Sequence, residues 1–274
     1  MKKNKEELIE ISKVIRKDIV KMLTESGSGH PGGSLSAADI VTTLFFNELN
    51  IDPKNPRWED RDRIVLSKGH AAPVLYSALA RRGYFDPAKL LTLRKIGSDL
   101  QGHPNMNDIP GIDMSTGSLG QGISAAVGMA LAGKTDNKSY RVYALLGDGE
   151  LEEGQVWEAA MSAAHYKLDN MMIFVDFNGL QIDGEVTKVM NPSPIDKKFE
   201  AFGWNVLVID GHNYDEILDA IEKAKEHKGQ PTAVICKTVK GKGVSFMENE
   251  ASWHGTAPSK EQCAQAISEL GGEQ

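Results

Sequence analysis

The sequence predicts an α/β fold: a doubly wound, mostly parallel sheet with helices on both faces. Short apolar runs that read as strands alternate with helical patterns, and repeated strand–helix–strand units produce parallel sheets. The apolar runs contain few polar residues, as expected for strands covered on both faces. The 274 residues are 41% hydrophobic but only 7% aromatic, with 27 glycines, which suits closely packed α/β layers better than a β-sandwich.

The expected elements follow a regular order. The apolar runs that predict strands lie at 63–67, 140–147, 171–176, 204–210 and 231–239. The helical patterns lie at about 5–24, 71–83, 152–166, 214–228 and 259–270. We interpret 191–203, which is punctuated by prolines, as a connector, and 241–258 as a long loop of the kind that often belongs to a site. Residues 1–274 are therefore expected to form a single domain whose first and last patterns are terminal helices.

Composition and charge exclude several classes of function. The net charge is −7 with dispersed acidic residues, and no basic stripe indicates nucleic-acid binding. No apolar run approaches the length of a membrane span, and the start of the chain lacks the apolar stretch of a signal peptide. The two cysteines, Cys236 and Cys263, form no disulfide framework, and Cys236 lies in a strand-like run and is expected to be buried. These features predict a cytoplasmic protein.

Polar side chains are expected at the carboxyl ends of two neighbouring strands. Asp148 stands between Gly147 and Gly149 at the end of the run 140–147. Asn178 comes 30 residues after Asp148, just past the next run at 171–176. Ligands gather at this edge of open parallel sheets, and a carboxylate, an amide oxygen and a backbone carbonyl suit Mg²⁺ or Ca²⁺. The alternative is that Asp148 caps the following helix and Asn178 only forms a turn.

The Gly-Asp-Gly sequence and the spacing to Asn178 resemble the fingerprint of enzymes that bind thiamine diphosphate. The resemblance implies that Asp148 and Asn178 hold Mg²⁺ (or Ca²⁺) through their side chains and that Leu180 adds its backbone oxygen. It also implies that Gly147 and Gly149 lie at the cofactor and that the Gly149 N–H faces a phosphate.

Longer motifs resemble transketolase over nearly the whole chain. They are "SGSGHPGGSLS" (26–36), "LSKGHAAPVLY" (66–76), "GHPN" (102–105), "STGSLGQGISAAVGMA" (115–130) and "WHG" (253–255). Histidines in glycine-rich turns suit hydrogen bonding and proton transfer near neutral pH. The resemblance implies that His70 contacts the cofactor diphosphate. It implies catalytic positions for His30, His103 and His254 around the substrate channel. His165 and His212 lie outside these motifs and are assigned no role.

The resemblance assigns two further regions. The backbone of Gly117, Ser118 and Leu119 is expected to lie against the cofactor, although the family pattern often has proline where this chain has Ser118. The small residues Gly122, Ala126 and Ala130 that follow are also explained by close helix packing. Glu153 is implied at the contact between the two cofactor sites of a dimer.

A complete transketolase is more than twice as long as this chain and has a pyrimidine-binding domain, which no segment here matches. We therefore expect a fragment or, preferably, the amino-terminal subunit of a split transketolase. The partner would be a carboxy-terminal transketolase subunit carrying the pyrimidine-binding domain, in a dimer of heterodimers (a heterotetramer). The implied reaction transfers a two-carbon ketol unit from a ketose phosphate to an aldose phosphate, as in the pentose phosphate pathway.

Three alternatives remain open at the level of the sequence. The chain could serve another thiamine diphosphate enzyme, such as 1-deoxyxylulose-phosphate synthase or a 2-oxo acid dehydrogenase. It could be a non-catalytic assembly subunit, although the retained Asp148, Asn178 and histidines argue against this. A nicotinamide-binding domain is disfavoured, because "GSLGQG" follows no strand-like run.

Overall fold

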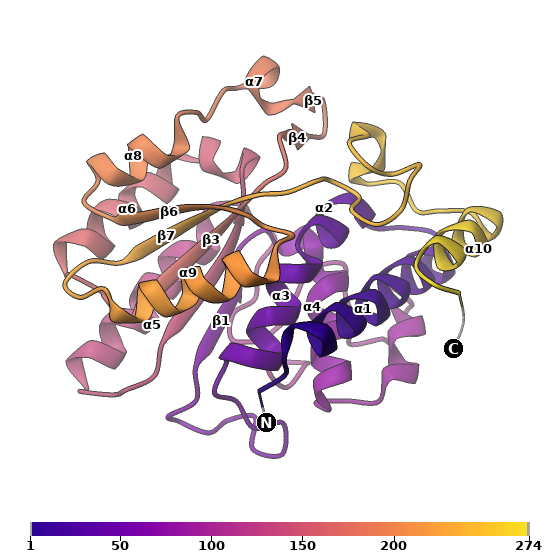
Figure 1. Ribbon diagram of the computed structural model, residues 1–274. Coiled ribbons are helices and arrows are strands. Elements are labelled where there is room, and N and C mark those ends of the chain that lie inside the picture. Colours follow the sequence, from indigo (N-terminus) through magenta and orange to yellow (C-terminus); the bar gives the residue numbers. More distant parts are fainter. Residues whose placement is uncertain (1, 273–274) are drawn as a thin grey trace.

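A five-stranded parallel sheet forms the centre of the protein, seen here in a computed structural model that describes residues 2–272 (Figure 1). Its strands, in the spatial order β1-β2-β3-β7-β6, are Arg63–Leu66, Val142–Gly147, Met171–Phe177, Thr232–Lys237 and Asn205–Asp210. All neighbouring pairs are parallel. The predicted parallel α/β fold is confirmed, and each of the five strands coincides with one of the predicted runs.

Helices surround the sheet. The α-helices are α1 Lys5–Ser26, α2 Pro31–Ser36, α3 Ala38–Thr43, α4 Ala72–Arg82, α5 Gln121–Thr135, α6 Gly154–His165, α7 Val186–Val189, α8 Ile195–Ala201, α9 Tyr214–Glu226 and α10 Lys260–Glu269. Shorter helical turns are η1 Leu44–Glu48, η2 Gly69–Ala71, η3 Pro87–Thr92, η4 Gly149–Glu152 and η5 Ala251–His254. α1 and α10 occupy the places where terminal helices were expected, and they pack against each other (Figure 1).

Alternate strand residues face two separate apolar cores. Tyr143 and Leu145 of β2 point into the core shared with α1, α3, α4 and α9. Ala144 and Leu146 of the same strand point into the core shared with α5, α6 and α8. This alternation follows from the two-residue period of a strand. Because both faces of the sheet are covered by helices, loops and polar side chains gather where the strands end.

Three segments differ from the sequence-based expectation. Residues 191–203, interpreted as a connector, contain α8, whose Phe199 is fully buried against the sheet. The strand β6 was expected to be covered on both faces but is an edge strand, and Val208 is 48% exposed. The polar loop after β3 also contains a small hairpin, β4 Leu180–Gln181 and β5 Gly184–Glu185. Apolar runs do not reveal edge position, which depends on strand order.

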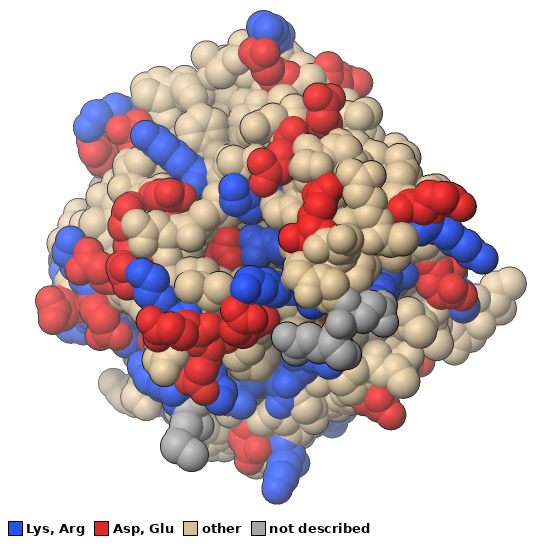
Figure 2. Space-filling view, turned by 45° about the vertical axis from the view of Figure 1, so that its right-hand side comes forward, with Lys and Arg blue, Asp and Glu red and all other residues tan. Residues whose placement is uncertain are grey.

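The surface agrees with the charge analysis. On the face shown in Figure 2, basic and acidic side chains are interspersed. None of the helices among residues 2–272 is long and apolar enough to cross a membrane. Cys236 is fully buried as predicted, and neither it nor Cys263 forms a disulfide.

Candidate active site

A cavity of about 220 Å³ lies at the carboxyl ends of β1, β2 and β3. It is lined by His30, Gly33, Lys68, His70, Gly117, Leu119, Gly147, Asp148, Gly149, Glu150, Asn178, Leu180, Gln181, Ile182, Lys240 and His254. Ten of these sixteen positions were selected from the sequence. Segments that are far apart in the chain therefore meet at the edge of the sheet where ligands are expected to bind.

Asp148 is a buried carboxylate with two backbone partners. Its side chain is placed by the turn after β2, and the residue is 3% exposed. Oδ1 accepts from the Gly149 N–H at 2.8 Å, and Oδ2 accepts from the Gly179 N–H at 2.6 Å. Burial and then the negative charge of Asp176 raise the pKa of Asp148 to about 6, and the two hydrogen bonds only partly offset this. Asp148 thus caps a turn, as the alternative interpretation held, yet its charge is poorly compensated.

The other expected metal ligands lie in the turn opposite Asp148. The Asn178 side-chain oxygen accepts from the Leu180 N–H at 3.1 Å, and its amide nitrogen donates to Asp176 at 3.2 Å. The Leu180 carbonyl accepts from Lys240 Nζ at 3.3 Å. Among residues 2–272, no lysine or arginine forms an ion pair with the buried Asp148 carboxylate. Together with the Asn178 amide oxygen and the Leu180 carbonyl it forms a hard oxygen donor set, which fits Mg²⁺ or Ca²⁺.

Lys240 supplies a positive charge to the cavity. It is only 1% exposed, and its Nζ lies 3.1 Å from His254 Nδ1. Burial and the nearby charge of Lys68 lower the pKa of Lys240 to about 8. An ammonium group held in this way is suited to an anionic ligand. Lys240 was not selected from the sequence, because it lies between the predicted strand at 231–239 and the predicted loop at 241–258 and belongs to none of the recognised motifs.

Three of the predicted histidines form a cluster. The ring centroids of His30, His70 and His254 lie 5.1–5.5 Å apart. Burial is the largest cause of the lowered pKa of each ring, to about 4 for His30 and about 3 for His254, and neighbouring positive charges add to it. These rings are therefore neutral at pH 7 and able to accept a proton or to hydrogen-bond hydroxyl groups. His30 Nδ1 is buried without a partner.

Three predicted site residues do not line this cavity. His103 is exposed, and its ring packs against Gly117, where a Cβ atom would lie 2.8 Å from the His103 ring. The φ of +141° at Gly117 is a second, separate constraint that favours glycine. Ser118 and Glu153 are exposed beside the cavity.

The Gly149 N–H, expected to face a phosphate, donates to Asp148 in this structure. Gly122 packs directly on Ser67, as its role in helix packing predicts.

A buried ion pair that sequence reasoning missed crosses the floor of the site. Lys68 and Asp176 pair directly, with side-chain exposures of 2% and 0%. Lys68 also donates to the Gly33 carbonyl at 2.8 Å, and Asp176 accepts from Ser36 and Thr238. Burial raises the pKa of Asp176, but the charge of Lys68 and these hydrogen bonds outweigh it and hold the pKa below its ordinary value. The sequence did hold a signal for this pair, because Lys68 directly follows the apolar run 63–67 and Asp176 ends the run 171–176.

Glu150, also missed, joins the strand ends to the loop before α5. One of its oxygens accepts from Ser67 Oγ at 2.5 Å and from the Gly120 N–H at 2.9 Å. The other accepts from the Gly147 N–H at 3.1 Å. Burial raises the pKa of this carboxylate despite the three bonds. Glu150 therefore fixes the two glycine turns that bound the cavity.

Comparison with known proteins supports the motif-based assignment. Residues 5–274 match the family model "Transketolase, thiamine diphosphate binding domain". A protein of a Clostridium species named 6-deoxy-6-sulfo-D-fructose transketolase subunit SqwG is 48% identical, over 94% of each chain. One of the named subunits of the apulose-4-phosphate transketolase of Phocaeicola vulgatus is 40% identical, over 93% of this chain and 90% of its own. Human transketolase is 46% identical, but this chain spans only 41% of it.

The three-dimensional comparison agrees. The crystal structure of transketolase from Campylobacter jejuni superimposes with a TM-score of 0.93 at 36% identity. The match covers 99% of this chain and 44% of that enzyme. The predicted resemblance, its fold and its enzyme class are therefore confirmed.

Proposed function

Since the chain belongs to the transketolase family through its thiamine diphosphate-binding domain, we propose that it is the amino-terminal subunit of a two-chain transketolase. With a partner that carries the pyrimidine-binding domain, it transfers a two-carbon ketol unit from a ketose phosphate to an aldose phosphate. The lengths of the relatives support this proposal, because the chain spans 94% and 90% of two proteins named as subunits. We propose a dimer of heterodimers, in which the exposed Glu153 meets its counterpart.

The buried and poorly compensated Asp148 is the observation on which the site assignment depends. In the proposed site, Asp148, Asn178 and the Leu180 carbonyl would hold Mg²⁺, whose charge would neutralise part of the cofactor diphosphate at the strand ends. Lys240 compensates part of the remaining phosphate charge, and the neutral ring of His70 donates a hydrogen bond to the diphosphate. The backbone of Gly117–Leu119 lies along the cofactor, and Gly147 and Gly149 allow the phosphate to approach closely. A phosphate at Gly149 would share or displace the hydrogen bond to Asp148.

When bound, thiamine diphosphate supplies a thiazolium carbon that stabilises the carbanion of the transferred unit. The protein contributes orientation and proton transfer. His30 and His254, neutral at pH 7, accept protons from or donate hydrogen bonds to the sugar hydroxyls. His103, at the outer edge, contacts the donor sugar. The buried strand ends exclude water from the diphosphate side.

The identity of the donor sugar is part of the proposal. The Clostridium relative is named for 6-deoxy-6-sulfo-D-fructose and the Phocaeicola relative for apulose 4-phosphate. We therefore propose a ketose with an anionic substituent as the donor, with phosphorylated and sulfonated ketoses as the candidates. The pyrimidine-side partner would contact that anionic end.

Purified chain and partner, mixed with Mg²⁺ and thiamine diphosphate, provide the test. We expect ketol transfer from xylulose 5-phosphate or the sulfonated ketose only when both chains are present. The chain alone should bind the metal and diphosphate weakly and turn over no substrate. Asp148→Ala should abolish transfer while leaving the complex assembled. Activity with pyruvate but not with a ketose would favour the synthase-like or dehydrogenase-like alternative. Failure of the reconstituted complex to bind the cofactor would favour a pure assembly subunit.

A further inference from the structure

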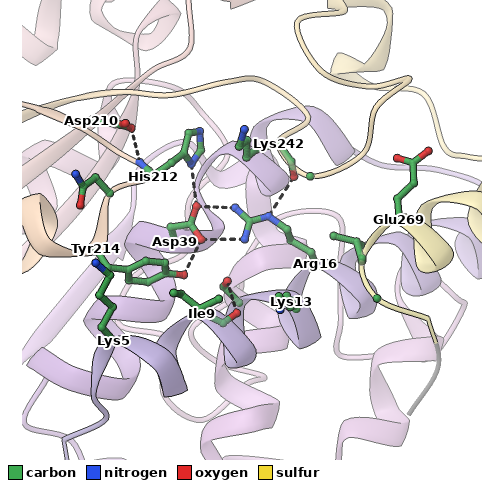
Figure 3. Close-up of a pocket in the computed structure, with 15 residues that line it drawn as sticks. Lys5, Ile9, Lys13, Arg16, Asp39, Asp210, His212, Tyr214, Lys242 and Glu269 are labelled. Carbon is green, nitrogen blue, oxygen red and sulfur yellow. Dashed lines mark hydrogen bonds and ion pairs between the residues drawn. The ribbon is translucent and has the colours of Figure 1, made fainter.

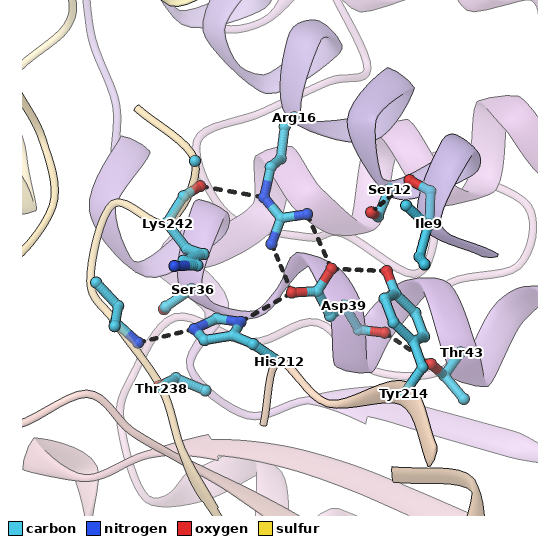
Figure 4. A network of polar contacts seen from close by, with 12 residues as sticks. Ile9, Ser12, Arg16, Ser36, Asp39, Thr43, His212, Tyr214, Thr238 and Lys242 are labelled. Atoms are coloured by element: carbon cyan, nitrogen blue, oxygen red, sulfur yellow. Dashed lines mark hydrogen bonds and ion pairs between the residues drawn. The ribbon is translucent and has the colours of Figure 1, made fainter. Parts of the chain in front are cut away.

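A second polar network lies outside the cofactor cavity, beside a hollow of about 660 Å³ between α1, the start of α9 and the segment at 242–243 (Figure 3). Its centre is Asp39 of α3, which is 4% exposed. Asp39 accepts two hydrogen bonds from Arg16 of α1, at 2.7 and 2.9 Å. It also accepts one from Tyr214 at 2.7 Å and pairs with His212 Nδ1 at 2.8 Å (Figure 4).

These contacts fill the hydrogen-bonding capacity of the Asp39 carboxylate. Burial raises the pKa of Asp39, but the charge of Arg16 and the hydrogen bonds from His212, Arg16 and Tyr214 outweigh it and hold the pKa well below its ordinary value. Asp39 is therefore a permanent anion that holds Arg16 and His212 in fixed orientations.

His212 uses its second ring nitrogen to hold the backbone. Nε2 lies 2.9 Å from the Val239 nitrogen and accepts its N–H. The ring proton must then lie on Nδ1, from which it is donated to Asp39. Arg16 makes the corresponding contact further along, because its Nε donates to the Lys242 carbonyl at 3.1 Å (Figure 4). The network is thus hydrogen-bonded to the backbone on either side of Lys240, at Val239 and at Lys242.

Lys240 needs such anchors. Its ammonium group is buried in the cofactor cavity, and a long charged side chain gains free energy by reaching solvent whenever the backbone allows it. The Gly241 N–H donates to the Gly32 carbonyl at 3.1 Å, which holds the segment on the side of the cavity. The contacts of His212 and Arg16 hold it at Val239 and Lys242, from residues that do not line the cavity.

We propose that His212 and Arg16 are positioning residues that hold Lys240 in the cofactor cavity and thereby set the affinity of the chain for a diphosphate group. This inference rests on the proposed cofactor site. Neither residue touches the cavity, so their effect passes through the backbone of residues 239–242.

Two amide substitutions separate the two hydrogen bonds of the His212 ring. His212→Asn keeps a donor near the position of Nδ1, for Asp39, but has no group that reaches Val239. His212→Gln places its amide oxygen near the position of Nε2 and keeps the acceptor for Val239. Tyr214→Phe is a network control, because it removes one bond to Asp39 and touches no residue of the segment 239–242. Lys240→Met reports the effect of the ammonium itself.

The measurement is the affinity of the full chain for inorganic diphosphate with Mg²⁺, by calorimetry, with the unfolding midpoint of each variant recorded in parallel. We expect His212→Asn to weaken binding about tenfold, equivalent to about 1.4 kcal/mol. His212→Gln and Tyr214→Phe should stay within about twofold of the wild type, equivalent to about 0.4 kcal/mol. In the Lys240→Met background, His212→Asn should cause no further loss, because residues that act through one another are not additive.

Each failure has a distinct meaning. Equal losses for the Asn and Gln variants, or additive losses in the double variant, would overturn the positioning role. So would unchanged affinity in His212→Asn when Lys240→Met binds weakly. If Lys240→Met itself binds diphosphate as well as the wild type, Lys240 does not set the affinity and the positioning role is wrong. Failure of the wild-type chain to bind diphosphate with Mg²⁺ would instead contradict the proposed cofactor site.

Discussion

Asp148→Asn separates a metal ligand from a structural cap, because the two roles predict opposite effects on the metal-free chain. The substitution removes the charge and keeps the shape of the side chain. A pKa raised from its ordinary value of 3.8 to about 6 makes the charged form unfavourable by about 3 kcal/mol at neutral pH. The variant recovers this free energy.

The opposing cost is one hydrogen bond. Asp148 accepts from the Gly149 and Gly179 N–H groups, and an amide oxygen can serve only one of these positions. An unsatisfied buried N–H costs about 1–3 kcal/mol. The gain therefore equals or exceeds the cost. We expect the metal-free variant to be as stable as the wild type, or more stable by up to about 2 kcal/mol.

Urea unfolding at pH 7.5, with and without Mg²⁺ and inorganic diphosphate, measures both effects. A ligand at 100 times its dissociation constant should stabilise the wild type by about 2.7 kcal/mol and the variant by almost nothing. Asp86→Asn is the matched control, since Asp86 is an exposed cap that accepts from the Ala88 N–H at 2.9 Å. If Asp148→Asn destabilised the metal-free chain by several kcal/mol and left the effect of the ligand unchanged, Asp148 would be only a cap.

Three further predictions follow from the same site. Gly117 has a φ of +141° and lies against the His103 ring, so Gly117→Ala should lower the free energy of unfolding by about 1–3 kcal/mol and weaken diphosphate binding. Gly97 also has a positive φ but has open space around it, so Gly97→Ala should affect only stability. Equal diphosphate binding in both variants would contradict a close approach of the cofactor to Gly117. The unfolded chain protonates its histidines near pH 6.5, whereas the folded pKa values are about 4 for His30 and about 3 for His254. These rings should therefore remove stability from the ligand-free chain as the pH falls from 6.5 toward 4. The urea midpoint of His254→Gln should fall less over this range than that of the wild type, and equal falls would place the ring in water. Removing the divalent cation with a chelator should abolish tight binding of thiamine diphosphate to the reconstituted complex, measured by fluorescence titration, and unchanged binding would exclude the metal bridge.

Local patterns in the sequence were sufficient for much of the site. Apolar runs at 140–147 and 171–176 predicted β2 and β3, and the carboxyl ends of parallel strands share one edge of the sheet. It follows from this geometry alone that Asp148 and Asn178 lie close together. Gly117 was selected through the resemblance alone, and the structure gives the physical reason, because glycine tolerates its backbone conformation.

The tertiary structure decided which charges meet. Lys240 could be assigned to the site only from the structure, in which its ammonium group contacts the Leu180 carbonyl. In the same way, His212 gained a role only through its hydrogen bonds to Asp39 and Val239. The sequence by itself determined the strands, the turns and the donor groups at their ends, because these depend on neighbours within a few residues. Only the folded chain determined burial, pKa and hydrogen-bond partners, because those are sums over segments that are distant in sequence and adjacent in space.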